Sequence, residues 1–175
     1  MQLNEKEIKE RAPFLCTVHS DYLDYMHNTD CHVSLKYGRP YLGLAIRLND
    51  HFYVVPLTSR TTYTREGRGK NKRSPLTTTF IKRGEKEIAN LLHNNMFPVP
   101  ENEIERVFID PQKDIRLANE QRQIRKQWVE INMKSANVYR DRYDTQSRNY
   151  HFLVKICCDF KKLEDACLQW QMKRQ

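Results

Sequence analysis

The chain has 175 residues, enough for one domain with a substantial buried core. Its 30 Lys and Arg residues outnumber its 22 Asp and Glu residues, and the resulting net charge of +8 favours a polyanionic partner, nucleic acid before an anionic membrane surface. The chain contains no apolar run of roughly 18 residues, its N-terminus lacks the apolar core of a signal peptide, and its five cysteines follow no export signal. We therefore exclude a membrane-spanning protein and expect a cytoplasmic protein with reduced thiols.

The first forty residues predict two short elements and a loop. Phe14–Val18 has the composition of a short strand, and Ser20 is a plausible N-cap for a brief helix that carries Tyr22. Residues 28–38 are predicted to be a loop that contains Lys36.

A β-hairpin is the clearest predicted element. Tyr41–Leu48 is an apolar run, Phe52–Leu57 is an aromatic and β-branched run, and Asn49-Asp50 between them supplies turn chemistry. Gly43 within the first strand indicates a bulge or a close backbone approach.

Cationic and hydroxyl side chains flank this hairpin at one end. Arg39 precedes the first strand, and Thr58, Ser59 and Arg60 follow the second. Because antiparallel geometry brings these two strand ends together, we expect two cations and two hydroxyls to meet at one edge of the sheet.

Residues 60–83 form the most basic segment of the chain. Glycines and a proline predict a mobile basic loop over residues 60–76, and Thr77–Ile81 has strand composition. The concentration of basic residues next to the hairpin end favours a segment that follows an RNA backbone over a merely solvated run of charge. The candidate RNA-binding residues here are Arg65, Arg68, Lys70, Lys72, Arg73, Lys82 and Arg83.

Downstream, the pattern predicts mostly helices. Glu85–Asn95 has helical spacing, residues 96–100 (MFPVP) predict an extended turn, and residues 103–109 resemble a strand. Asp110-Pro111 is a strong helix start, and one apolar stripe continues from there to Arg140. The flanks of this helix carry further candidate RNA-binding residues, Arg122, Arg125 and Lys126.

The remaining C-terminal segment is only partly determined. Residues 150–158 are apolar enough for the core, but their period does not decide between helix and strand. Asp159 is predicted to cap a last helix. The order of elements indicates an α+β fold in one domain over residues 1–175, with a small, strongly bent antiparallel sheet or barrel surrounded by helices.

The residues around the hairpin end suit RNA cleavage. The ribose 2′-OH can attack the adjacent phosphate, so the protein must orient that attack, neutralise the added charge on phosphorus and move two protons. Arginine suits the charge, the Thr58 and Ser59 hydroxyls suit orientation, and Tyr22 or Lys36 could move protons if its pKa were depressed. The alternative is structural: Thr58-Ser59 would only form a turn, and Arg39 would only cap a strand.

Metal-type ligands also occur near the N-terminus. Cys16, His19, His27, Cys31 and His32 lie within a short span, but their spacing matches no standard zinc pairing. We therefore expect no metal and no cofactor, with Cys16 buried beside solvent-facing histidines.

Several segments together resemble a known family. RPYLGLAIRLNDHFYVVPLTS and NNMFPVPENEI, with DYLDYM and CCDFKKLE, are similar to the ToxN/AbiQ endoribonucleases of type III toxin–antitoxin systems, and most to the CptN-type toxins. The resemblance covers most of the chain in order. It implies a barrel-like core related to MazF/Kid-type toxins and a metal-independent, sequence-specific endoribonuclease that cuts single-stranded cellular mRNA to a 2′,3′-cyclic phosphate. The implied partner is a small repetitive antitoxin RNA, a pseudoknot that the toxin processes and that forms a closed protein–RNA assembly with it.

The resemblance also implies site residues, with two departures. The family tyrosine falls on Tyr22, the Thr-Ser pair on Thr58 and Ser59, and the lysine before the first hairpin strand on Arg39. A second family lysine falls on Thr61, so the residue that moves protons is open, since arginine does not readily exchange a proton. The predicted catalytic set is Tyr22, Lys36, Arg39, Thr58, Ser59 and Arg60.

Two other functions remain open at this point. A non-catalytic RNA-binding barrel would use the same basic surface, and a MazF-like RNase toxin would be neutralised by a protein antitoxin. Cleavage of RNA separates the first alternative from the predicted toxin.

Overall fold

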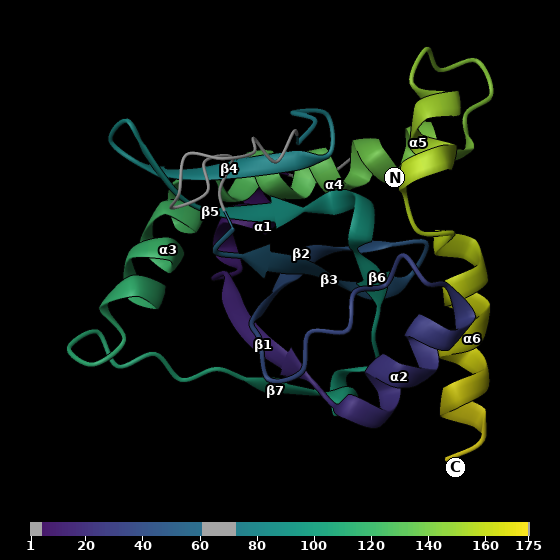
Figure 1. Cartoon of the computed structure of the whole chain (residues 1–175), viewed down its shortest axis with the longest axis horizontal. Helices are drawn as coiled ribbons and strands as arrows, with labels where there is room; N and C mark the ends of the chain where they lie inside the picture. Colours follow the sequence, from purple (N-terminus) through teal and green to yellow (C-terminus); the bar gives the residue numbers. More distant parts are fainter. Residues whose placement is uncertain (1–4, 61–72, 175) are drawn as a thin grey trace.

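The computed structural model describes residues 5–60 and 73–174, and these form a seven-stranded antiparallel sheet with helices packed around it (Figure 1). The strands are β1 (Phe14–Val18), β2 (Tyr41–Leu48), β3 (His51–Thr58), β4 (Thr78–Arg83), β5 (Lys86–Leu92), β6 (Phe97–Pro98) and β7 (Ile104–Arg106). The α-helices are α1 (Glu5–Glu10), α2 (Ser20–Thr29), α3 (Ile115–Lys126), α4 (Trp128–Tyr143), α5 (Tyr150–Ile156) and α6 (Phe160–Met172), with short 3-10 turns η1 (His93–Asn95) and η2 (Glu101–Glu103). None of the described helices is long and apolar enough to cross a membrane.

The sheet is bent but open. Its strand order is β4-β5-β3-β2-β1-β7, with β6 paired to β3, so β4 and β7 are unjoined edges within the described residues. β3 changes partners along its length, pairing with β6 at Tyr53 and Val54 and with β5 at Leu57 and Thr58. The α+β class is therefore confirmed, and of the two predicted forms, an antiparallel sheet or a barrel, the described residues form the open sheet.

The β2–β3 hairpin agrees with the prediction. Asn49 and Asp50 adopt φ values of 48° and 63°, the left-handed conformation that a tight two-residue hairpin turn needs. The Asn49 side chain donates to the buried Glu164 of α6 at 2.7 Å, and the Tyr53 hydroxyl donates to the same carboxylate at 2.8 Å. The hairpin is thus held at its turn as well as along its ladder.

A bulge interrupts β2 between Gly43 and Arg47, and a side chain of α4 hydrogen-bonds to a backbone amide within it. The Asn132 side-chain oxygen accepts from the Ala45 amide at 2.8 Å, while its nitrogen donates to a carbonyl of its own helix. Because an unpaired buried amide is costly, this asparagine fixes α4 against the irregular part of β2.

The predicted helix over Glu85–Asn95 is wrong, because most of this segment is strand β5. Gly84, with φ of 60°, turns the chain back from β4, and β5 then pairs with β4 on one side and β3 on the other. Strand pairing on both sides overrides the helical spacing of its apolar residues.

The predicted long helix is two helices. Residues 110–113 form a turn, α3 begins at Ile115, and Gln127 leaves the helical conformation before α4 starts at Trp128. The Trp128 indole N–H donates to the Arg11 carbonyl at 2.6 Å, which fixes the start of α4 against the N-terminal segment. The predicted apolar stripe is nevertheless on the inner face, with Ile124, Trp128, Ile131 and Val138 buried.

The C-terminal elements complete the core. Residues 150–156 are helical, and the Asp159 carboxylate accepts from the Lys162 amide at the start of α6, as predicted. α6 packs against β6 and α2, and α4 packs against β2 (Figure 1). The packing of these helices, within the described residues, does not involve the end of β3 that carries Thr58.

Candidate functional site

The hairpin register brings two predicted site residues to one sheet end. Tyr41 of β2 pairs with Pro56 of β3, and the Leu57 amide donates to the Pro40 carbonyl at 3.3 Å. Continuing this register by two residues sets Arg39 opposite Thr58. Thr58 is buried in the ladder with β5, whereas Arg39 is exposed.

The backbone of Arg60 is fixed by three side chains. Its amide donates to the Thr58 hydroxyl at 3.2 Å, and its carbonyl accepts from Asn90 Nδ2 at 3.2 Å and from Arg73 Nη2 at 3.5 Å. Ser59 lies between these anchored residues and is exposed. The turn after β3 is therefore held at its start, where its hydroxyl and guanidinium can meet a ligand.

Lys36 joins this group through its electrostatic environment. Its side chain is half-buried, and burial together with the positive charges of Arg73, Arg39 and Arg60 lowers its pKa from 10.5 to about 8. Four cationic side chains from three separate segments thus act on one another, which is unfavourable unless an anion binds. We define Lys36, Arg39, Arg60 and Arg73 as the cation cluster.

Two polar atoms, one in the cation cluster and one beside it, lack hydrogen-bond partners among the described residues. They are Asn90 Oδ1 and Arg73 Nε, and both are buried. Burial lowers the pKa of Arg73, the charge of Glu87 raises it, and the charge of Arg60 lowers it further. Chemically, the arrangement offers guanidinium groups for a phosphate and one lysine whose proton is unusually easy to remove.

Tyr22 of the predicted catalytic set is a core residue in the structure. Tyr22 is fully buried in α2, donates to the Pro98 carbonyl at 2.8 Å and packs edge-on against Trp170. Burial first, with further contributions from Cys167 and Glu103, raises its pKa far above the ordinary value. A proton carrier needs a depressed pKa, so Tyr22 does not meet the condition, and its place is in the core.

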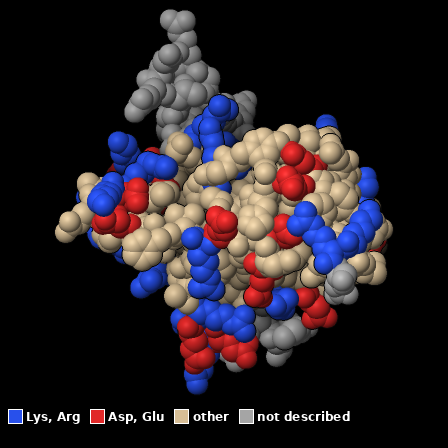
Figure 2. Space-filling model, turned by 90° about the horizontal axis from the view of Figure 1, so that it is seen from below, with Lys and Arg blue, Asp and Glu red and all other residues tan. Residues whose placement is uncertain are grey.

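The remaining basic candidates divide into two sets. Arg65, Arg68, Lys70 and Lys72 fall outside the described residues, as does most of the predicted loop over residues 60–76. The others are exposed at the end of β4 and on α3, which packs against β4: Lys82, Arg83, Arg122, Arg125 and Lys126. Figure 2, which views the molecule from below, shows cationic and acidic side chains interspersed on the face seen there.

The N-terminal metal-type ligands do not gather into one site. His19 pairs with Glu103 at 3.3 Å, and His27 Nδ1 lies 2.6 Å from the Val33 carbonyl oxygen. Cys16 is buried, and burial raises the pKa of its thiol. His19 and His27 are therefore occupied by other contacts, and Cys16 lies in the core.

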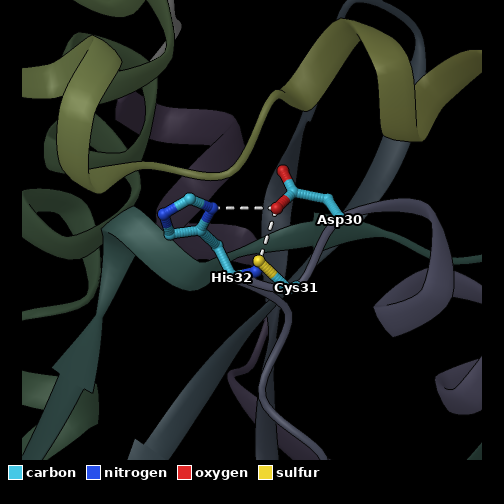
Figure 3. Close-up of side chains that lie close together, drawn as sticks. All are labelled: Asp30, Cys31 and His32. Carbon is cyan, nitrogen blue, oxygen red and sulfur yellow. Dashed lines mark hydrogen bonds and ion pairs between the residues drawn. The ribbon is translucent and has the colours of Figure 1, made fainter.

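Asp30, Cys31 and His32 do lie close together (Figure 3). However, one Asp30 oxygen accepts from the amide and Nδ1 of His32, each at 2.9 Å, and the other accepts from the Asp159 amide at 2.6 Å. Burial would raise the pKa of Asp30, but these donors outweigh it and lower the pKa. The carboxylate thus joins the end of α2 to the start of α6, a structural role.

Comparison with known proteins identifies the family. The pattern of the family described as "Toxin ToxN, type III toxin-antitoxin system" matches residues 14–168. The chain belongs to the ToxN toxin family. Endoribonuclease ToxN of Bacillus thuringiensis subsp. kurstaki is 32% identical over 93% of the chain and 87% of that protein. Endoribonuclease AbiQ of Lactococcus lactis subsp. lactis is 29% identical over 96% of the chain and 94% of that protein.

Solved structures agree with this ToxN-family assignment. One, described for selective toxin inhibition by a non-coding RNA pseudoknot in type III systems, has a TM-score of 0.79 at 30% identity, covering 92% of this chain and 99% of that one. AbiQ, described as a lactococcal anti-phage endoribonuclease, has a TM-score of 0.80 at 24% identity, covering 93% and 99%. The predicted family and the predicted class, an endoribonuclease toxin, are thereby confirmed.

Two residues that contact the Arg60 carbonyl were not assigned to this group from the sequence. Asn90 is a polar residue among the apolar residues of β5, but the helix predicted there gave no reason to place it beside Arg60. Arg73 was expected only to follow an RNA backbone, whereas it lies against the Arg60 carbonyl.

Proposed function

We propose that this protein is the toxin of a type III toxin–antitoxin system and cuts single-stranded RNA sequence-specifically without a metal cofactor, by attack of the ribose 2′-OH. The observation that carries the proposal is the cation cluster, in which Lys36 has a pKa of about 8 beside three arginines at the end of β3. The endoribonuclease relatives give the reaction class, and the cluster supplies groups suited to it. We propose bacterial cytoplasm as its location.

The proposed reaction exchanges one phosphate ester for another. The 2′ oxygen forms a bond to phosphorus, the bond to the 5′ oxygen breaks, and the products are a 2′,3′-cyclic phosphate and a 5′-OH. One proton leaves the 2′-OH and one must reach the 5′ oxygen.

Each residue of the site has a proposed role in that exchange. Lys36 in its neutral form accepts the 2′-OH proton, because its lowered pKa makes the free amine accessible near neutral pH. Arg39 and Arg60 bind the phosphate oxygens and stabilise the charge that develops on them, with Arg73 beside them. Thr58 and Ser59, on the anchored turn, orient the scissile phosphate.

The proposed partner is a small repetitive antitoxin RNA that folds as a pseudoknot, is processed by the toxin and forms a closed hetero-oligomeric assembly with it. The cationic residues of β4 and α3 and the basic segment after Arg60 would hold its backbone, and cellular mRNA would be the substrate of the free toxin. Raising the salt concentration is expected to weaken the complex steeply, with log K falling linearly in log[salt]. A flat salt response would contradict this electrostatic account.

The decisive experiment measures cleavage of RNA in EDTA, with end-group analysis of the products. We expect 2′,3′-cyclic phosphate ends, no cleavage of a 2′-O-methylated RNA, and a rate at least about 100-fold lower for Lys36→Arg, which keeps the charge but not the titration. Lys155→Arg, an exposed lysine of α5, is the matched control. Wild-type rates in both Ser59→Ala and Arg39→Ala would show that the site is misplaced.

Two alternatives predict other outcomes. A non-catalytic RNA-binding protein would retain RNA without fragmenting it. A MazF-like toxin with a protein antitoxin would cut RNA but purify from its native locus with a protein and no discrete RNA. We also propose that the bent sheet is related to that of the MazF/Kid-type toxins, which a direct structural superposition tests.

A further inference from the structure

A hollow of about 500 Å³ opens beside β1, β2 and β3, apart from the cation cluster. Phe14, Gly43 and Phe52 line it, and none of the four residues of the cation cluster does. Gly43 lies four residues after Arg39, which precedes β2, and this stretch of chain spans at most about 14 Å. The hollow is therefore a second feature of the same hairpin.

An aromatic pair lies in this hollow. The rings of Phe14 and Phe52 are half-buried and nearly parallel, with centroids 6.0 Å apart and an interplanar angle of 6°. A Cβ atom at Gly43 would lie 2.5 Å from Phe14 Cζ and 2.8 Å from Phe52 Cζ. The close approach that Gly43 indicated in the sequence is thus made by the tips of these two rings, which lie over the strand. Any side chain at position 43 would push the two rings apart.

Arginines surround the aromatic pair. The Arg106 guanidinium carbon lies 4.2 Å from the Phe14 ring centroid, a cation–π contact. Arg47 and Arg11 also line the hollow; Arg47 pairs with Glu101 at 3.2 Å, and Arg11 donates to the Ala45 carbonyl. Glu101 is the one acid among the described residues that line it, so the hollow is cationic.

We propose that this hollow binds an unpaired base of an RNA strand, which adds to the stack formed by Arg106, Phe14 and Phe52. Base stacking on aromatic rings with arginine at the backbone is the chemistry by which proteins bind single-stranded nucleic acid. The half-buried, parallel rings of Phe14 and Phe52 offer a surface for base stacking, and the arginines of the hollow offer positive charge for the RNA backbone. The inference rests on the proposed function, because it takes RNA as the partner, and it assigns a base subsite outside the cation cluster.

The test is photo-crosslinking with the whole protein. The first probe is a single-stranded 2′-O-methyl RNA hexamer carrying 5-iodouridine, which the proposed reaction cannot cleave. The second is the RNA that purifies with the protein from cells fed 4-thiouridine. Mass spectrometry of the cross-linked peptides is expected to locate the label on Phe14 or Phe52. A crosslink from the hexamer assigns the base to substrate, and one from the co-purified RNA alone assigns it to the antitoxin.

Three variants separate stacking from packing. Phe52→Leu keeps apolar volume but removes the ring, and we expect it to bind the hexamer about tenfold more weakly. Phe52→Tyr keeps the ring and is expected to restore both affinity and crosslink. Phe152→Leu, an exposed aromatic on α5, is the matched control and is expected to bind like the wild type.

The outcomes distinguish this subsite from the proposed function. Absence of any crosslink to Phe14 or Phe52 from both probes, or equal affinity of Phe52→Leu and the wild type, would overturn the subsite even if RNA is cleaved. A crosslink in a protein that cuts no RNA would support the subsite and contradict the proposed reaction. Binding of a peptide in place of RNA in this hollow would likewise overturn the subsite.

Discussion

The pH dependence of RNA cleavage is expected to follow the ionisation of Lys36. Because the neutral amine is the proposed base, kcat/KM should rise tenfold per pH unit below a pKa of about 8 and level off above it. Arg73→Gln removes one of the charges that lower this pKa. The variant should therefore move the inflection to higher pH, whatever it does to the maximal rate.

The size of the effect follows from the causes of the shift. A lysine with a pKa of 10.5 is neutral in about 1 molecule in 3,000 at pH 7, and with a pKa of about 8 in about 1 in 10, a gain of roughly 300-fold. Burial is the largest cause of this lowering, and Arg73, Arg39 and Arg60 share the remainder. Removing Arg73 should thus move the inflection by at most about one pH unit.

The assay is initial-rate cleavage of a fluorescent RNA between pH 5.5 and 9.5 in EDTA at constant ionic strength. Arg148→Gln, which removes an exposed arginine between α4 and α5, controls for the loss of one positive charge and should leave the inflection unmoved. An inflection that stays in place in Arg73→Gln would refute the assignment to Lys36. A rate that falls with pH through 8 would refute the base role and make Lys36 the acid.

Three further predictions concern residues that the structure places in the core. Tyr22→Phe should cut RNA within about twofold of the wild type while losing about 1 kcal/mol of unfolding free energy, because only a hydrogen bond to a backbone carbonyl is removed; a hundredfold loss of cleavage in a folded variant would return Tyr22 to the active site. Burial lowers the pKa of His93 to about 3, so on acidification the unfolded state binds a proton before the folded state does. Lowering the pH from 7 to 5 should therefore reduce the free energy of unfolding, measured with urea, by about 2 kcal/mol. His93→Gln should remove this pH dependence. Equal pH slopes in both proteins would count against a neutral buried His93. Asn132→Leu should destabilise the fold by about 1–3 kcal/mol, since the Ala45 amide loses its acceptor, and exposed Asn137→Leu on the same helix should change stability by less than about 0.5 kcal/mol; equal values would show that the amide finds another partner.

Local sequence patterns predicted the features of the structure that depend on neighbouring residues. The β2–β3 turn, the Asp159 cap and the buried stripe from Ile124 to Val138 all depend on residues within a few positions of one another. The sequence pattern predicts such features because side-chain periodicity and turn conformation act over the same range.

Predictions failed where a distant partner decides the conformation. β5 has apolar residues at helical spacing, but pairing with β3 and β4 makes it a strand. The break at Gln127 has no glycine or proline to announce it, and it accompanies the bond from Trp128 to the Arg11 carbonyl, 117 residues away. Closure of the sheet depends on partners for β4 and β7, which no local pattern specifies.

The candidate site shows the same division. The hairpin ends predicted that Arg39 and Thr58 would meet, since that follows from antiparallel pairing alone. Asn90 reaches Arg60 only through the β3–β5 pairing, and Tyr22 turned out to be a core residue because α2 packs against α6. Neither fact is encoded within the segment that carries the residue.

The arginine at position 39 and the lowered pKa of Lys36 are consistent parts of one arrangement. An arginine at position 39 does not exchange protons, so a base must come from elsewhere, and Lys36 lies three residues before it in a loop closed by the bond from the Arg39 amide to the Lys36 carbonyl. Because Arg39 stays charged at every relevant pH, it also contributes to lowering the pKa of Lys36. The same guanidinium would then stabilise the phosphate in the transition state and keep the neighbouring amine available as a base. Substituting lysine for Arg39 would weaken both effects, because the new side chain could itself lose its proton within the cluster.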